Sequence, residues 1–292
     1  GATGMIGDPS GKSSERNLLD EDKLRFNQQA IKNQLSKFLS FDKKMSNMAL
    51  ILNNYDWMKG FSFLNFIRDI GKHITVNYMM SKDSVKNRIS SESRSGMSFT
   101  EFTYQIVQGY DFLFLNRNYS CLIQMGGSDQ WGNITTGMEL LRRIDGEKGY
   151  AITYPLITKS DGSKFGKSEG DNIWLDSKKT SVYKFYQYWL NTSDDDAKDY
   201  IKTFTFLDKK QVEKIIFKHE LEPHLRLLQK TLASEITKLV HSEKELINSI
   251  KASEVLFSKD FLNDINKIDE ALFLDIFEGV PIANISLNEI NN

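Results

Sequence analysis

QMGGSDQWGN, residues 124–133, is the stretch of the chain that decides the fold. A short apolar run precedes it at 121–123, and a segment with helical spacing of apolar residues follows at 134–143. This order predicts a buried strand, a glycine turn and a helix. In an open α/β sheet such a turn lies at the carboxyl edge of the strands, where ligands bind. The glycine pair lets a ligand approach the backbone, Asp129 can accept from a sugar hydroxyl, and Gln130 offers a donor and an acceptor. An ordinary strand-to-helix turn would explain the glycines alone, but the full combination favours a binding site.

The composition is that of a globular protein with room for one large domain or two ordinary ones. The chain has 292 residues, of which 40% are hydrophobic and 26% are charged, and its formal net charge is −1. Any nucleic-acid binding must therefore use local patches of charge. The single cysteine, Cys121, excludes an internal disulfide and a multi-cysteine zinc site, and we predict no metal site. No apolar run reaches the roughly 18 residues that a membrane span needs, so we expect a cytoplasmic protein without a membrane partner.

Both ends of the chain look like interior sequence. Residues 1–4 open on a turn without a methionine or a preceding strand, and residues 285–292 stop without an evident packing partner. We therefore expect an internal piece of a longer protein.

A glycine-rich loop with basic residues at its exit occupies residues 1–16, GATGMIGDPSGKSSER. The segment 10–13 resembles the end of a phosphate-binding P-loop, but the spacing from the preceding glycines does not fit that motif. A loop that holds negative charge through backbone N–H groups and Lys12 remains possible, with Arg16 nearby. Asp8 either caps the turn or holds a ligand ammonium group.

Residues 99–112, FTEFTYQIVQGYDF, predict a helix with one polar stripe. Tyr104, Gln108 and Asp111 fall at positions i, i+4 and i+7, which lie on one side of a helix. A surface helix would carry a similar stripe, but the flanking residues are so apolar that we expect this one to be shielded from bulk water. A buried polar stripe needs partners, and a polar ligand would supply them.

The remaining periodicities predict an α/β half followed by an all-helical half. We expect an amphipathic helix at 24–38, a buried strand at 48–52 that ends at the sequence NNYDW, and a further strand at 151–157. A glycine- and lysine-rich loop follows at 158–170; it is either an ordinary solvated loop or one that closes over phosphates. Helices are then predicted at 182–190, 194–202, 208–219 and 222–240.

Five of these stretches, in the same order, closely resemble bacterial-type tyrosyl-tRNA synthetase, a class I aminoacyl-tRNA synthetase. They are GATGMIGDPSGKSSER, NNYDW, SFTEFTYQIVQGYDF, QMGGSDQWGN and LITKSDGSKFGKSEG. The resemblance runs from Gly1 to about Phe257, and KFGKS at 164–168 is similar to the family's Lys-Met-Ser-Lys-Ser signature. The family's His-Ile-Gly-His-like signature belongs upstream of Gly1 and is not in this sequence. The tyrosine that contacts the substrate hydroxyl also belongs upstream, and the family's C-terminal S4-like domain is missing as well.

The resemblance implies an α/β fold with a Rossmann-like parallel-sheet catalytic domain, lacking its first strand, followed by an all-helical domain. It places the C-terminal part of the class I catalytic domain at 1–178, with a mobile loop at 159–170. A helical anticodon-recognition domain would occupy 179–257, and a linker towards the absent S4-like RNA-binding domain would occupy 258–292. A homodimer is the family expectation.

The resemblance also implies activation of L-tyrosine with ATP to tyrosyl-adenylate, followed by transfer to the 3′ end of tRNA(Tyr). By this likeness Asp8, Tyr104 and Gln108 hold the substrate ammonium group. Asp111 accepts a hydrogen bond from the phenol, and Gln130 contacts the carboxylate region.

For ATP, which would arrive with Mg²⁺, the resemblance implies ribose contacts from Gly127 and Asp129. The departing pyrophosphate would be stabilised by Lys12, Arg16, Lys164, Lys167 and Ser168, of which Lys167 also binds ATP. The alternatives are tryptophanyl-tRNA synthetase, which shares the fold, and an inactive or RNA-binding relative, such as a splicing cofactor, on the same scaffold.

Overall fold

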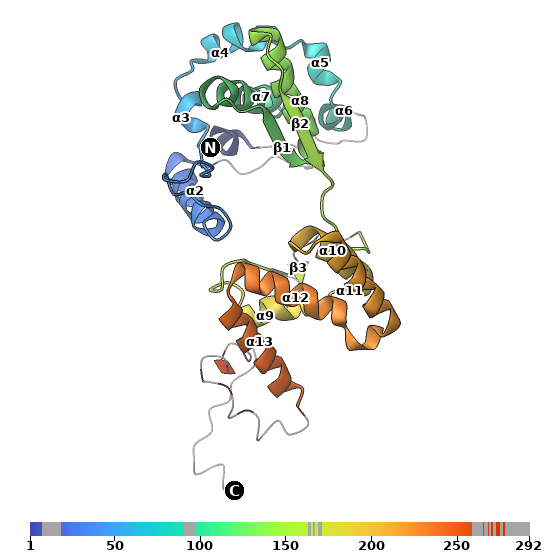
Figure 1. Cartoon of the computed structure of the whole chain (residues 1–292). Helices are drawn as coiled ribbons and strands as arrows, with labels where there is room; N and C mark the ends of the chain where they lie inside the picture. Colours follow the sequence, from blue (N-terminus) through green and yellow to red (C-terminus); the bar gives the residue numbers. More distant parts are fainter. Residues whose placement is uncertain are drawn as a thin grey trace. The chain divides into compact units, whose positions relative to one another are not determined.

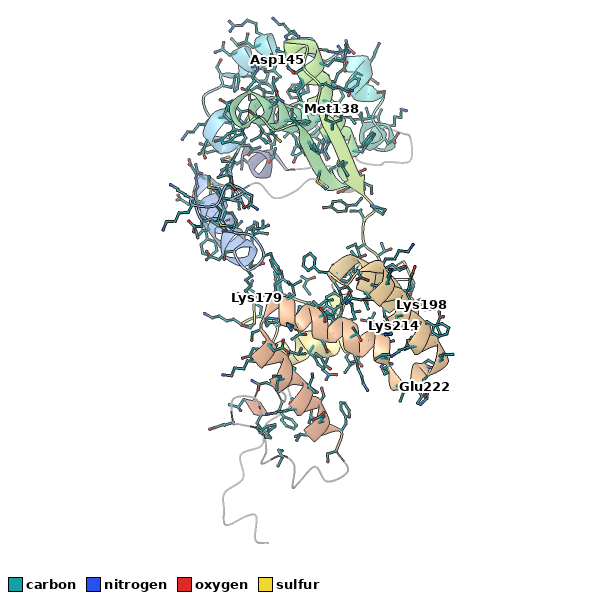
Figure 2. All side chains as sticks on the ribbon, viewed as in Figure 1. Met138, Asp145, Lys179, Lys198, Lys214 and Glu222 are labelled. Carbon is teal, nitrogen blue, oxygen red and sulfur yellow. The ribbon has the colours of Figure 1, made fainter. Side chains whose placement is uncertain are left out.

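The computed structural model describes residues 1–7, 19–89, 97–162, 165, 167–168 and 171–258, together with residues 265, 268, 270, 273–274 and 277. The chain divides into two compact units, Gly1–Leu156 and Ile157–Asn292 (Figure 1). Figure 2 shows the side chains of both units, with Met138 and Asp145 labelled in the first and Lys198, Lys214 and Glu222 in the second. Among the described residues no helix is both long and apolar enough to cross a membrane.

The first unit combines a parallel strand pair with a set of helices. Its elements in chain order are α1 (Ala2–Ile6), α2 (Glu21–Leu35), α3 (Tyr55–Met58), α4 (Phe63–Asp69), a 3-10 turn η1 (Gly71–His73), α5 (Val76–Met80), α6 (Asp83–Ile89), α7 (Phe99–Tyr119), β1 (Ile123–Gly127), a 3-10 turn η2 (Ser128–Gln130), α8 (Trp131–Leu140), a π-helical turn η3 (Leu141–Asp145) and β2 (Tyr150–Tyr154).

The predicted strand, glycine turn and helix are present as β1, η2 and α8, and α8 leads on to β2. The two strands are parallel, with Ile123 opposite Tyr150 and Gly127 opposite Tyr154. This is the βαβ unit of an α/β fold, since parallel neighbours need a crossover connection. The prediction of a Rossmann-like α/β unit followed by helices is thus confirmed.

The expectation that β1 would be buried is wrong in the described part of the chain. Gly126 on β1 faces Gln130 of η2 and Ile134 of α8, but alternate side chains point the other way. On that opposite face Met125 is 63% exposed and its cross-strand neighbour Ile152 is 47% exposed. Parallel sheets are normally covered on both faces, and the described residues cover only one.

Residues 48–52 do not form the predicted strand. They have no regular secondary structure, and no described residue pairs with them in a ladder. Leu50 is 55% exposed as a consequence. An apolar run has the same composition whether or not a neighbouring strand lies beside it, so periodicity alone could not distinguish the two cases.

Helices α7 and α8 cross at a contact between two glycines. A Cβ atom at Gly137 would lie 2.8 Å from the Cβ of Phe112 and 3.1 Å from the carbonyl oxygen of Gly109. A Cβ at Gly109 would in turn lie 3.1 Å from the backbone nitrogen of Gly137. The absence of side chains at both positions allows the two backbones to touch, and the unit's core lies beside the crossing, at Phe112, Leu113, Leu140 and Leu141.

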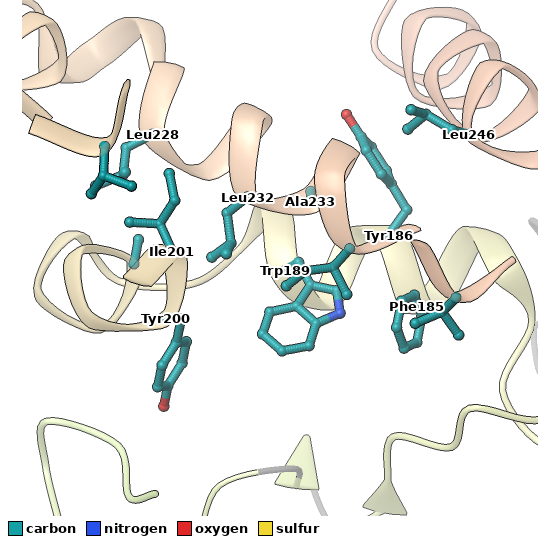
Figure 3. Close-up of a cluster of buried hydrophobic side chains, with 13 residues drawn as sticks. Phe185, Tyr186, Trp189, Tyr200, Ile201, Leu228, Leu232, Ala233 and Leu246 are labelled. Atoms are coloured by element: carbon teal, nitrogen blue, oxygen red, sulfur yellow. The ribbon is translucent and has the colours of Figure 1, made fainter. Parts of the chain in front are cut away.

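The second unit is helical around an aromatic core. It contains two short antiparallel strands, β3 (Lys167–Ser168) and β4 (Asp171–Asn172), followed by α9 (Val182–Leu190), α10 (Asp194–Phe204), α11 (Lys209–Leu221), a 3-10 turn η4 (Pro223–Leu225), α12 (Leu227–Val240) and α13 (Glu243–Leu256). Figure 3 shows the core, including Phe185, Tyr186, Trp189, Tyr200, Ile201, Leu228, Leu232 and Leu246.

The predicted helices of this unit are present, with one correction. The long helix expected at 222–240 begins only at Leu227, because Pro223 starts a separate 3-10 turn and Arg226 adopts a left-handed conformation with φ of 53°. Proline removes a backbone donor and a left-handed residue breaks the hydrogen-bond ladder, so the two together interrupt the helix.

Residues just after Leu156 pack with the helical unit. The hydroxyl of Tyr200 donates to the carbonyl of Thr158 at 3.3 Å, and the backbone nitrogen of Ser160 donates to Asp196 Oδ1 at 2.6 Å. Phe165 also packs against the aromatic core. The compact units therefore divide at 156/157, whereas the functional boundary predicted at 178/179 and the roles assigned to 179–257 and 258–292 stay predictions.

Candidate functional site

The polar stripe predicted on α7 lies where a ligand could use it. A capping box fixes the start of the helix: the Ser98 side chain accepts from the Glu101 backbone, and the Glu101 side chain accepts from the Ser98 backbone. Tyr104 is 5% exposed, while Gln108 and Asp111 are half-buried. The stripe is therefore shielded from bulk water, as its apolar flanks predicted.

Two donors from the NNYDW segment hold the carboxylate of Asp111. Asn54 Nδ2 donates to Asp111 Oδ2 at 2.8 Å, and Trp57 Nε1 donates to Asp111 Oδ1 at 2.9 Å. The indole of Trp57 is itself oriented by stacking on Phe114, one turn further along α7, with ring centroids 4.4 Å apart. Each carboxylate oxygen thus has one fixed donor and keeps capacity for another, since an ionised carboxylate accepts about four hydrogen bonds.

Asn54 and Trp57 are site residues that sequence reasoning missed. The NNYDW motif is recognisable in the sequence, but nothing in it assigns a role to either residue. No periodicity relates residue 54 to residue 111, because these two side chains meet through the tertiary fold alone. The one available signal was the pair of asparagines and the tryptophan directly after an apolar run, because buried polar side chains need hydrogen-bond partners.

Burial raises the pKa of Asp111 from 3.8 to about 6. The hydrogen bonds from Asn54 and Trp57 act in the opposite direction, because both favour the charged form. Desolvation is the larger effect. The group is therefore an acceptor near neutral pH and takes up a proton in mildly acidic solution.

A second group of predicted residues meets where α7 faces the start of α8. Gln108 Nε2 donates to Gln130 Oε1 at 3.2 Å, and Asn133 Nδ2 donates to the same oxygen at 3.1 Å. Gln130 Nε2 in turn donates to Asp129 Oδ2 at 3.3 Å. The structure thus brings Gln108, Gln130 and Asp129 into one hydrogen-bonded chain, although the first lies on a different helix from the other two.

The other amide atom of Gln108 is the most informative one. Its Oε1 is buried and has no hydrogen-bond partner among the described residues. A buried acceptor without a donor costs free energy. Gln105, Gln124 and Gln229 also carry such an oxygen in the described structure, so it is the position of Gln108 on the α7 stripe that makes its oxygen relevant to a ligand. A ligand that carries N–H donors, such as an ammonium group, would supply the missing bond.

Gly127 is required by the position of Asp129. A Cβ atom at Gly127 would lie 2.7 Å from Asp129 Oδ1 and 3.0 Å from a methyl carbon of Leu156. Any other residue would push the carboxylate away, so the glycine allows Asp129 to lie over the turn. The side chain of Asp129 is exposed there and can accept from hydroxyl groups of a ligand.

The remaining predicted site residues lie beyond what the structure describes. Asp8, Lys12, Arg16 and Lys164 fall outside the described residues, and only the backbone of Lys167 and Ser168 is described, in β3. The structure therefore shows the positions of the predicted residues on α7 and in the β1–α8 turn. The residues predicted to stabilise the pyrophosphate stay a prediction. Within the described ranges no group of three or more His, Cys, Asp or Glu residues could hold a metal ion.

Comparisons with known proteins agree on one family. The family model described as tRNA synthetases class I (W and Y) matches residues 1–258. The tyrosine–tRNA ligase of Flavobacterium psychrophilum is 64% identical over 292 residues, which are 99% of this chain and 68% of that protein. The tyrosine–tRNA ligase of Bacteroides thetaiotaomicron is 60% identical over 286 residues, covering 98% of this chain and 66% of that protein.

Solved structures give the same result. The crystal structure of a C-terminally truncated mitochondrial tyrosyl-tRNA synthetase from Aspergillus nidulans superposes with a TM-score of 0.72 at 30% identity, over 88% of this chain and 74% of that one. The corresponding enzyme of Coccidioides posadasii gives a TM-score of 0.67 at 28% identity, over 84% of this chain and 70% of that one.

Proposed function

We propose that this chain, which belongs to the bacterial-type tyrosyl-tRNA synthetases of class I, joins L-tyrosine to tRNA(Tyr) in two steps. First, the carboxylate of tyrosine attacks the α-phosphorus of ATP; the new P–O bond gives tyrosyl-adenylate as the bond to pyrophosphate breaks. The 3′-terminal adenosine of the tRNA then attacks the adenylate carbonyl carbon, and AMP leaves. No protein side chain forms a covalent bond, so catalysis consists of positioning and of stabilising charge.

The observation that carries this proposal is the environment of Asp111. Its carboxylate is fixed by Asn54 and Trp57 and retains acceptor capacity. It lies on the same stripe of α7 as Gln108, whose buried Oε1 has no donor in the described structure. One amino acid offers partners for both, because tyrosine carries a phenol O–H at one end and an ammonium group at the other.

The other described residues take the roles that fit their chemistry. Tyr104 and Gln108 bind the ammonium group, and Gln130 contacts the carboxylate region of tyrosine. Gly127 and Asp129 meet the ribose hydroxyls of ATP, in agreement with the exposed carboxylate over the glycine turn.

The charged residues outside the described ranges complete the proposal by family resemblance. Asp8 joins the ammonium site, and the lysines and hydroxyl group of the loop act on the pyrophosphate with the basic residues of the first loop; these are Lys12, Arg16, Lys164, Lys167 and Ser168. Mg²⁺ would enter with the ATP phosphates, which supply its oxygen ligands.

Two observations favour this function over its alternatives. A fixed carboxylate acceptor suits the hydroxyl of tyrosine, whereas the indole of tryptophan offers only an N–H group. The tyrosine–tRNA ligases of Flavobacterium psychrophilum and Bacteroides thetaiotaomicron match this chain at 64% and 60% identity, which favours an active ligase over an inactive RNA-binding relative.

We also propose that the chain works in the cytoplasm as a homodimer. The evidence for a dimer is the exposed apolar surface of helix α4. Phe63 is 65% exposed, Leu64 is 75% exposed and Ile67 is 45% exposed. Apolar side chains gathered in this way are typical of an interface. Sedimentation of the wild type against Leu64→Asp tests the assignment: the variant should sediment as a monomer, and a wild-type monomer would contradict it.

Amino-acid-dependent exchange of pyrophosphate into ATP tests the activity. We expect exchange with tyrosine and very little with phenylalanine or tryptophan. Exchange driven by tryptophan would overturn the substrate assignment. No exchange with any amino acid, combined with binding of structured RNA, would favour the RNA-binding relative.

A further inference from the structure

Helix α2 contacts the segment that supplies the donors to Asp111. Asn53 Nδ2 donates to Gln28 Oε1 at 3.0 Å. Asp56 accepts from both arms of the Arg25 guanidinium, from Nη2 at 2.5 Å and from Nη1 at 3.4 Å. Arg25 and Gln28 are three residues apart, so they lie next to each other on one face of α2. That face therefore holds the segment at two points.

The segment forms a helical turn, closed by a hydrogen bond of 3.0 Å from the backbone nitrogen of Asp56 to the carbonyl of Asn53. These two residues contact α2, whereas Asn54 and Trp57 donate to the carboxylate on α7. The members of each pair are three residues apart, which places them on the same side of a helical turn. Helix α3 within this turn is only four residues long, and a helix this short is unstable alone. Its orientation therefore depends on the contacts on both of its sides.

The contact between Asn53 and Gln28 is shielded from water. Asn53 is 5% exposed, and Gln28 is half-buried. The oxygen of the same amide, Asn53 Oδ1, accepts from the backbone nitrogen of Tyr55 at 3.0 Å, so both ends of the amide are used. Without Gln28 a buried N–H group would lose its acceptor, which costs free energy. The amide of Asn53 thus links α2 directly to the start of α3.

Helix α2 is itself fixed near its N-terminal end. The Asp20 side chain caps the helix by accepting from the backbone nitrogen of Lys23 at 2.8 Å. Leu24 is 6% exposed and lies against α1, where a Cβ atom at Gly4 would be 3.1 Å from Leu24 Cδ2. Arg25 follows directly, so its guanidinium extends from a part of the helix that is held in place.

We propose that Gln28 and Arg25 are positioning residues for recognition of the tyrosine phenol, an inference that rests on the proposed function. Through the turn of α3 they determine the orientation in which the carboxylate of Asp111 is held. A hydrogen bond weakens steeply when its angle departs from the favoured range, so a rotated carboxylate would bind the phenol O–H less well. Phenylalanine has no such group, and its binding would not change. The two residues therefore contribute to selectivity and not to the binding of amino acids in general.

Two substitutions at Gln28 test this proposal. Gln28→Met removes the acceptor at nearly constant length, and Gln28→Glu keeps an acceptor oxygen. The matched control is Gln29→Met, because Gln29 Nε2 donates to Asn33 Oδ1 at 2.8 Å within α2 itself. Arg25→Met is a second test that should fold like the wild type, since the pair with Asp56 is partly exposed and such pairs add little to stability.

Three quantities are measured on the full chain. They are kcat/KM for tyrosine and for phenylalanine in ATP–pyrophosphate exchange, the thermal midpoint, and the rate of hydrogen exchange at the indole N–H of Trp57, followed by NMR. We expect Gln28→Met to lower the preference for tyrosine about tenfold and Arg25→Met about threefold, which are couplings typical of one hydrogen-bond network. Hydrogen exchange at Trp57 should accelerate in both variants. Gln28→Glu and Gln29→Met should keep the preference within about twofold of the wild type.

A double variant shows whether the effect acts through the carboxylate. Once Asp111→Ala has removed the acceptor, Gln28→Met should no longer change the ratio of kcat/KM for the two amino acids. A change of the same size in both backgrounds would overturn the route through Asp111.

The outcomes separate the possible failures. A wild-type preference in both Gln28→Met and Arg25→Met would overturn the proposal. An equal loss for tyrosine and phenylalanine, or the same loss in Gln29→Met, would also overturn it, because either result would reduce the effect to general stability. A wild-type chain without tyrosine-dependent exchange would overturn the proposed function, while the hydrogen-exchange rates at Trp57 would still decide whether α2 holds the turn.

Discussion

The two units use their interiors for different purposes. In the first unit, polar side chains such as Asn54, Gln105 and Asn133 are buried beside the stripe of α7, and one amide oxygen of that stripe lacks a partner in the described structure. In the second, the interior is built mainly from rings and aliphatic side chains that pack on one another, with Phe185 and Leu232 at most 1% exposed. The second unit also buries polar side chains, among them His219, Gln229 and Thr237, so the number of buried polar groups does not distinguish the two interiors. What differs is their placement: in the first unit they lie beside the α7 stripe that is proposed to bind the amino acid.

The largest expected effect is on substrate choice, from Asp111→Ala. The variant should lose most of its preference for tyrosine over phenylalanine, because the only acceptor proposed for the phenol in this structure is removed. A preference of roughly 10⁵ is the value known for tyrosyl-tRNA synthetase itself, and the geometry of Asp111 explains its direction but does not set its size. The measurement is kcat/KM for both amino acids in the exchange assay.

The matched control for that experiment is Asp145→Ala, in the same unit. Asp145 pairs with Arg117 at 2.5 Å, away from the α7 stripe, and should leave the preference unchanged. If Asp111→Ala weakens ATP and tyrosine binding equally, the distinction between a ligand-binding interior and a supporting one does not hold.

The second effect is on stability, from Leu232→Ala in the core of the second unit. Leu232 is fully buried, and truncating such a leucine typically costs about 2–5 kcal/mol of unfolding free energy, depending on how far the cavity collapses. Denaturant unfolding followed by tryptophan fluorescence measures the loss. KM for tyrosine should stay at the wild-type value; a rise in KM comparable to that in a site variant would break the comparison.

The third effect is a pH dependence that belongs to the first unit alone. Below about pH 6 Asp111 is protonated, so kcat/KM for tyrosine should fall about tenfold per pH unit and the preference over phenylalanine should narrow. Asp111→Asn should remove this acidic limb. A wild-type profile that is flat between about pH 5 and 7 would contradict the assignment.

The raised pKa of Asp111 also determines how the free energy of unfolding changes with pH. The folded-state pKa lies above the ordinary 3.8, so folding favours the protonated form. Stability relative to Asp111→Asn should therefore decrease as pH rises from about 4 to about 6 and stay level above that. Thermal midpoints of the two proteins across this range provide the measurement.

The smallest effect is expected from Lys198→Ala on the surface of the second unit. Lys198 pairs with Glu220 at 2.7 Å, joining α10 to α11, but neither side chain is buried. Water screens such pairs, and many contribute nothing measurable. We expect no resolvable change in the thermal midpoint or in exchange activity. A clear decrease in the thermal midpoint would show that the aromatic core is not the main source of stability in this unit.

Local patterns predicted those parts of the fold whose cause is local. The glycine turn between β1 and α8, the stripe of α7 and the helix at 182–190 all follow from spacing along a single element. The strand expected at 48–52 failed because strand formation depends on a neighbour. The helix expected at 222–240 was too long because Arg226 adopts a left-handed conformation. A glycine at this position would have indicated a helix boundary, but an arginine does not.

The residues of the candidate site were also predictable only where they lie on the same helix or turn. Residues that share a helix or a turn, such as Gln108 with Asp111, were found together. The donors to Asp111 and the attachment of Phe165 to the second unit depend on contacts between distant segments, which no periodicity reports.

The glycine crossing of α7 and α8 has a practical consequence for altering this protein. Because the two backbones touch at Gly109 and Gly137, the helix proposed to recognise the amino acid is held against the helix that follows the nucleotide turn. A library that varies the α7 stripe to accept tyrosine analogues can therefore leave the ATP contacts in register, provided that both glycines are kept fixed during selection.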